Sequence, residues 1–120
     1  MKSFFKSFIF AINGIKLCVL QRNFKTHVVC AILAIISGVI LHINLTEWYI
    51  IFICIGIVIS LEMINTAIEH LVNLIEPNHN AKAGAIKDIA AGSVLVFSVI
   101  SAIIGVMIFG KYILDLLFTY

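Results

Sequence analysis

An uncharged and almost wholly apolar run, residues 48–61, ends in a polar stripe. The stripe consists of Glu62, Asn65, Thr66, Glu69 and Asn73. At about 100° per residue on an α-helix, these side chains share one side while apolar residues cover the others. A helix that is apolar all round except along one line must be covered by lipid or by other helices. Because ionisable groups beside hydrocarbon are costly, the stripe is predicted to be functional.

The composition indicates a membrane protein. Of 120 residues, 62% are hydrophobic and only 12% are charged, and the mean hydropathy is +1.17, far above that of an ordinary soluble domain. No linker or internal repeat divides the chain, so residues 1–120 are expected to form a single membrane domain. Cys18, Cys30 and Cys54 are odd in number and lack metal-ligand spacing, so we interpret them as packing residues.

The amino-terminal segment, residues 1–22, has the pattern of an amphipathic surface helix. Its lysines fall within an arc of about 80° on a helical wheel, and most of the other residues are apolar. Such a helix lies in the membrane interface with its lysines reaching toward the headgroups. A cleaved signal peptide is the competing interpretation, but Lys16 and Arg22 interrupt the apolar part and no small-residue cleavage site follows.

The remaining pattern predicts three transmembrane helices. We place the first span at residues 28–43, a long second helix at 48–75, and a third span at 89–109. Pro77 ends the second helix, because proline cannot continue a helix comfortably. About 20 helical residues cross the hydrocarbon, so Glu62 should lie just inside one membrane boundary and Glu69 just beyond it. The fold class is therefore all-α and integral to the membrane.

The basic residues predict the orientation. Seven of the eight flank the side of the membrane where the second helix ends, and only Lys111 lies on the other side. By the positive-inside rule, the amino terminus and the polar stripe face the cytoplasm.

The stripe suggests acid-base and metal chemistry. Glu62 and Glu69 are two helical turns apart, about 10 Å along the axis, which suits separate roles. Near hydrocarbon, Glu62 is the candidate general base. Glu69, closer to water, is the candidate ligand for Mg²⁺, which uses one or two carboxylates together with substrate phosphates. Lys87 and Asp88 could meet a phosphate and a nucleotide hydroxyl at the start of the third helix.

Other interpretations remain open from the residues alone. Glu62 and Asn65 could form hydrogen bonds that hold membrane helices together, and Lys87 could merely fix the topology. Residues His27, His70 and His79 are interpreted as polar interface residues. The main alternative function is a small proton-coupled transporter that uses Glu62, and a non-enzymatic assembly protein is a third possibility.

Several motifs resemble one known family. Glu62-Met-Ile-Asn65-Thr-Ala-Ile-Glu69, the later Lys87-Asp88-Ile-Ala-Ala-Gly-Ser, and Asn23-Phe24-Lys25 before the first span are similar to the signature of the small bacterial membrane lipid kinases. That family includes diacylglycerol kinase and undecaprenol kinase. The resemblance covers most of the chain. It implies a homotrimer that transfers the γ-phosphate of ATP to a lipid alcohol with Mg²⁺, and no nucleic-acid partner.

The resemblance also implies roles for single residues. Glu62 corresponds to the general base with Asn65 beside it, and Glu69 to a metal-binding carboxylate. The nucleotide-binding positions are Lys87, Asp88, Asn73, Asn78, His79 and Asn80. Two positions depart from the family pattern: Gln21 replaces a second metal-binding Glu, and Asn73 replaces an Asp. A kinase weakened by Gln21 is therefore a further alternative. The segment before the first span favours undecaprenol slightly over diacylglycerol.

Overall fold

The structure, a computed structural model, describes residues 1–119 and contains only helices there. Their bounds are α1 Lys2–Val19, α2 Arg22–Ile40, α3 Leu45–Ile75 and α4 Ala81–Phe118. The last three are long and apolar enough to cross a membrane. This confirms the predicted fold class of three transmembrane helices that follow an amino-terminal helix.

All three helices begin before the predicted spans of 28–43, 48–75 and 89–109, and α4 also ends later, whereas α2 already ends at Ile40. Hydropathy marks where lipid begins, whereas the helices continue through the polar segments on either side of it. Thus α2 already begins at Arg22, and the polar segment 81–88 forms the first two turns of α4. At that end the Asn80 side chain accepts hydrogen bonds from the backbone N–H groups of Lys82 and Ala83, which is a typical helix N-cap.

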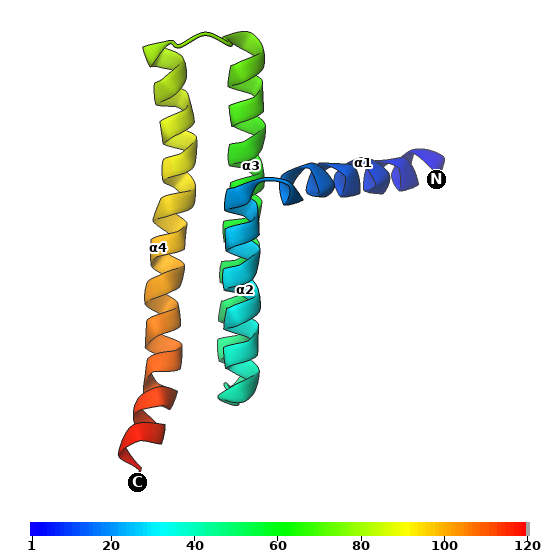
Figure 1. Cartoon of the computed structure of the whole chain (residues 1–120). Helices are drawn as coiled ribbons and strands as arrows, with labels where there is room; N and C mark the ends of the chain where they lie inside the picture. The colour runs from blue at the N-terminus through cyan, green and yellow to red at the C-terminus, as the bar shows by residue number, and fades with distance from the viewer. Residues whose placement is uncertain (120) are drawn as a thin grey trace.

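The helices α3 and α4 form a long antiparallel hairpin, α2 packs against α3, and α1 runs across the direction of the other three (Figure 1). With 31 and 38 residues, α3 and α4 are about 46 and 57 Å long. Both exceed the hydrocarbon thickness of about 30 Å. The connected ends of α3 and α4 project well past the level of α1 (Figure 1).

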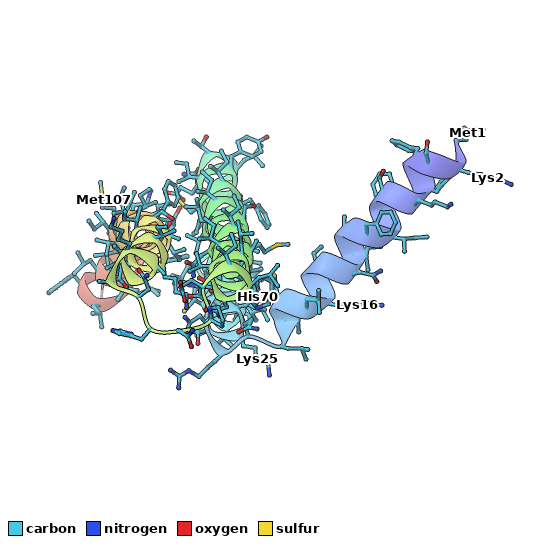
Figure 2. The ribbon with its side chains drawn as sticks, turned by 90° about the horizontal axis from the view of Figure 1, so that it is seen from above. Met1, Lys2, Lys16, Lys25, His70 and Met107 are labelled. Carbon is cyan, nitrogen blue, oxygen red and sulfur yellow. The ribbon has the colours of Figure 1, made fainter. Side chains whose placement is uncertain are left out.

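Little of α1 is packed against the rest of the chain. Viewed from above, it extends away from the bundle (Figure 2), and Cys18 near its carboxyl end is its single buried residue. The aromatic residues Phe4, Phe5 and Phe8 are more than half exposed and contact one another edge to face. A helix with such an exposed apolar surface is suited to the membrane interface.

A tight connection joins α2 to α3 at the other end of the bundle. His42 takes a positive φ of 52° there, and Gly38 on α2 lies directly against the Trp48 ring. Behind this turn, Ile43, Ile51 and Ile108 form a buried cluster that joins α3 to α4. The close approach at Gly38 fixes how α2 lies along α3.

A polar clasp reinforces the same end of the hairpin. Buried Glu47 accepts a hydrogen bond from the Tyr112 hydroxyl at 2.7 Å and forms an ion pair with Lys111. Glu47 and Asn44 also form a reciprocal capping box at the start of α3, in which each side chain accepts from the other's backbone N–H. The clasp therefore ties α4 to the first turn of α3.

Candidate active site

The first three residues of the polar stripe are buried, and burial decreases along α3 toward exposed Asn73. Glu62 and Asn65 are each only 3% exposed, Thr66 is buried as well, and Glu69 is half-buried. Thr66 donates to the backbone carbonyl of Glu62 at 3.0 Å, so its hydroxyl is satisfied within α3. The carboxylates of Glu62 and Glu69 and the carboxamide of Asn65 therefore remain available for chemistry.

Asn65 carries a buried hydrogen-bond acceptor that has no donor in the described part of the chain. Its Nδ2 donates to Glu69 Oε1 over a long 3.5 Å, while its buried Oδ1 has no hydrogen-bond partner among residues 1–119. A buried acceptor without a donor costs about 1–3 kcal/mol. Asn65 Oδ1 can therefore accept a hydrogen bond from a donor that one chain does not supply.

Two further helices approach Glu62. His27 on α2 places its Nε2 3.7 Å from Glu62 Oε2, and α1 brings buried Cys18 into the same region. Burial, and secondly the negative charge of Glu62, raise the pKa of the Cys18 thiol above its ordinary value. The sequence alone indicates a polar interface residue at His27. No periodicity within one helix could reveal this contact, because it joins two helices.

A second polar region lies beyond the stripe, at the turn between α3 and α4. Here Lys87 donates a hydrogen bond to the Asn73 carboxamide oxygen. A pocket of about 290 Å³ surrounds this contact. The pocket is lined by Asn73, Glu76, Pro77, Asn78, His79, Asn80, Ala83, Gly84 and Lys87. It brings together five of the six positions predicted to bind nucleotide; Asp88 is exposed on α4 and does not line it.

The residues predicted to bind metal do not form a complete site within one chain. In the part of the chain that the structure describes, no three His, Cys, Asp or Glu side chains are grouped to hold a metal ion. Glu69 is a single carboxylate that accepts only the long bond from Asn65, and Gln21 is half-buried in the α1–α2 connection. This donor set fits Mg²⁺ where phosphates and water complete the coordination.

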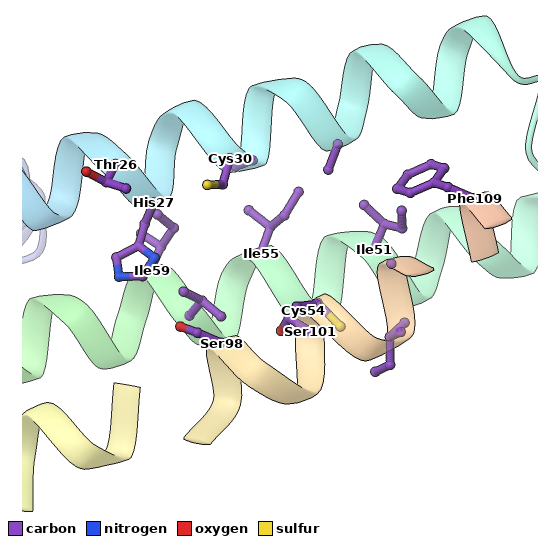
Figure 3. Close-up of a pocket in the computed structure, with 16 residues that line it drawn as sticks. Thr26, His27, Cys30, Ile51, Cys54, Ile55, Ile59, Ser98, Ser101 and Phe109 are labelled. Carbon is purple, nitrogen blue, oxygen red and sulfur yellow. The ribbon is translucent and has the colours of Figure 1, made fainter. Parts of the chain in front are cut away.

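An apolar cavity of about 390 Å³ lies among α2, α3 and α4. Residues of all three helices line it, including Cys30, Ile55 and Ser98, and His27 stands at one end (Figure 3). The cavity therefore runs from within the membrane toward the residue that contacts Glu62.

Together, the fold and the site define a small multi-pass membrane protein with a buried carboxylate site among its helices. The family model for prokaryotic diacylglycerol kinase matches residues 9–109. The chain belongs to this family, and it is a lipid kinase of the inner membrane.

Two curated relatives differ in their named substrate. The chain is 48% identical over 110 residues to undecaprenol kinase of Bacillus subtilis, covering 91% of this chain and 89% of the relative. It is 31% identical over 86 residues to diacylglycerol kinase of Synechocystis sp., covering 71% of this chain and 49% of that relative. Family membership removes the support for the transporter and assembly-protein alternatives.

Proposed function

We propose that this lipid kinase uses Mg-ATP to phosphorylate the hydroxyl of undecaprenol. The observation that carries the proposal is the order of groups along the α3–α4 hairpin. Buried Glu62 lies at the level where α1 and α2 meet the hairpin, half-buried Glu69 follows, and the Asn73–Lys87 pocket lies beyond both. Glu62 and Asn73 are about 16 Å apart along α3, so a lipid hydroxyl and a nucleotide can approach from opposite ends.

In the proposed reaction Glu62 acts as the general base. Its carboxylate takes the proton of the lipid hydroxyl, the resulting oxygen attacks the γ-phosphorus, and the bond to the β-phosphate oxygen breaks to release ADP. Phosphoryl transfer needs mainly alignment and charge neutralisation from a protein. Asn65, whose Oδ1 lacks a donor, is suited to accept a hydrogen bond from a bound group beside Glu62.

The charge of the triphosphate is balanced in two places. Lys87 supplies an ammonium group in the pocket where it now donates to Asn73, and Asn80, His79 and Asn78 offer polar contacts there. Glu69 would hold Mg²⁺, with Gln21 as a neutral second ligand, and bound Mg²⁺ supplies charge neutralisation at the phosphates.

The preference for undecaprenol over diacylglycerol follows from the comparison with the first relative. The relative that is 48% identical carries that name, and the likeness spans almost the whole chain. The cavity that ends at His27 is lined mostly by apolar side chains, which suits the hydrocarbon of either lipid and does not distinguish them. Both substrates present a primary hydroxyl, so the headgroup chemistry alone does not distinguish them.

We also propose that the working unit is a homotrimer. Three spans enclose little interior, and one chain provides only one metal-binding carboxylate at Glu69 together with an unsatisfied Asn65. A neighbouring copy that packs against the stripe could complete the donor set and shield the site from water.

The test of the proposed substrate is a direct comparison of lipid acceptors. Purified protein in mixed micelles receives Mg-ATP with undecaprenol or diacylglycerol at equal surface concentration, and the phosphorylated lipid is quantified. The proposal expects a higher kcat/KM for undecaprenol and a strong loss in Lys87→Met. Lys82→Met is the matched control, because Lys82 is exposed at the start of α4 and does not line the pocket. A higher kcat/KM for diacylglycerol would overturn the substrate assignment.

A further inference from the structure

His27 is placed where a general base needs support. Its Nε2 is 3.7 Å from Glu62 Oε2, and the His27 side chain is 21% exposed while that of Glu62 is 5% exposed. The nearby donors on α3 are already used: the Thr66 hydroxyl donates to the Glu62 backbone carbonyl, and Asn65 Nδ2 donates to Glu69. His27 is therefore the polar side chain of another helix that faces the Glu62 carboxylate.

The separation of 3.7 Å is slightly longer than a hydrogen bond. Contacts of catalytic groups are often long without substrate and tighten in the reacting complex. A small side-chain rotation would bring the N–H of an Nε2-protonated imidazole onto Glu62 Oε2. The other carboxylate oxygen, Oε1, would then be left for the lipid hydroxyl.

We propose that His27 is a positioning residue of the kinase, which donates a hydrogen bond to the buried Glu62 carboxylate and orients it toward the lipid hydroxyl. The proposal rests on the general-base role of Glu62 in the proposed function. His27 acts through Glu62 and does not touch the transferred phosphoryl group. No bond to His27 forms or breaks, so the balance of the reaction is unchanged.

The placement of His27 has a second consequence. The imidazole lines the end of the apolar cavity, where it projects from α2 beside α3 (Figure 3). Glu62 is not among the residues that line the cavity, so a lipid hydroxyl that arrives along the cavity meets His27 before it reaches the carboxylate. If His27 only lined the cavity, its substitution would change KM for the lipid and leave kcat unchanged.

The other titratable groups that act on Glu62 cannot replace His27. Cys18 on α1 is buried, and burial raises the pKa of its thiol, so it stays neutral and is a weak donor. Glu69 lies two turns further along α3 and carries the same charge as Glu62. His27 is thus the group that can donate to the carboxylate and hold it in place.

The experiment compares His27→Gln with His27→Asn in the lipid-phosphorylation assay. Gln carries an N–H donor with a reach close to that of Nε2, whereas Asn is one methylene shorter. We expect Asn to lower kcat about 10–100-fold, the range for loss of a supporting partner that orients a functional group, with KM for ATP and for lipid little changed. Gln should recover most of the rate. His42→Asn is the matched control and should keep the wild-type kcat, because His42 is exposed just beyond the far end of α2, lines neither the cavity nor the pocket, and Asn tolerates its positive φ.

A double variant tests whether His27 acts through Glu62. In Glu62→Gln the base is gone, so adding His27→Asn should cause no further loss. The His27 proposal is overturned if both His27 variants keep the wild-type kcat, if only KM for lipid rises, if Gln and Asn lose equally, or if the losses multiply in the double variant. Full activity of Glu62→Gln would instead refute the general-base role on which the proposal rests.

Discussion

Gly38→Ala offers a quantitative test of how α2 is docked on α3. A Cβ at this position would lie 2.8 Å from Trp48 Cη2 and 3.0 Å from Ile43 Cδ1, and real Cβ contacts are not that short. The Trp48 ring stacks on Phe52 with centroids 5.6 Å apart, and Ile43 is buried, so neither can move without disturbing its neighbours. Overpacking of this kind costs about 1–3 kcal/mol.

The opposing contribution is helix propensity, which favours Ala over Gly by about 1 kcal/mol. The expected net effect of Gly38→Ala is therefore a destabilisation of about 0–2 kcal/mol. Gly56→Ala on α3 is the matched control, because its Cβ would meet nothing within 4 Å. There only the favourable propensity remains.

Thermal unfolding in detergent, followed by circular dichroism, measures both variants against the wild type. We expect Gly56→Ala to unfold at the same or a higher temperature and Gly38→Ala at a lower one. Because docking of α2 sets the His27–Glu62 distance, Gly38→Ala should also reduce kcat. If Gly38→Ala is as stable as Gly56→Ala and fully active, the close packing at this turn does not fix the position of α2.

Three further predictions test the metal site, the nucleotide pocket and the clasp. Gln21→Glu should lower the Mg²⁺ concentration that gives half-maximal activity, since a carboxylate is the better Mg²⁺ ligand; an unchanged Mg²⁺ titration would refute a metal-binding role for this position. Asn80→Ala should raise KM for ATP and destabilise the start of α4 by about 1 kcal/mol, as expected for loss of an N-cap; an unchanged KM for ATP would separate Asn80 from nucleotide binding. Tyr112→Phe should lower the unfolding temperature, because Glu47 loses its hydroxyl donor, while the kinetic constants stay at wild-type values; reduced kcat at unchanged stability would contradict a purely structural clasp.

Sequence periodicity was sufficient for features that lie within one helix. The grouping of Glu62, Asn65 and Glu69 follows from helical spacing alone, and the structure buries the first two as expected. Hydropathy also located the three membrane helices. It missed several of their ends because a helix does not stop where lipid stops: α4 begins at Ala81, eight residues before the predicted start of that span at residue 89.

Contacts between distant segments could not be predicted in the same way. The His27–Glu62 contact joins α2 to α3, and the Tyr112–Glu47 bond spans 65 residues. Neither has a periodic signature, since each depends on how two helices are rotated against one another. The Asn73–Lys87 contact joins two positions that the family resemblance had grouped as nucleotide-binding, but periodicity alone did not relate them.

The most direct test of the central claim is transfer of labelled phosphate from γ-labelled ATP to the lipid alcohol by Glu62→Gln. Glu47→Gln is the matched control, because Glu47 is a buried carboxylate on the same helix at the opposite end. Removing a general base typically costs about 10²–10⁴-fold in rate. We predict such a loss of kcat in Glu62→Gln, with KM for ATP little changed, and a wild-type kcat for the folded fraction of Glu47→Gln. Equal kcat values for the two variants would contradict the account.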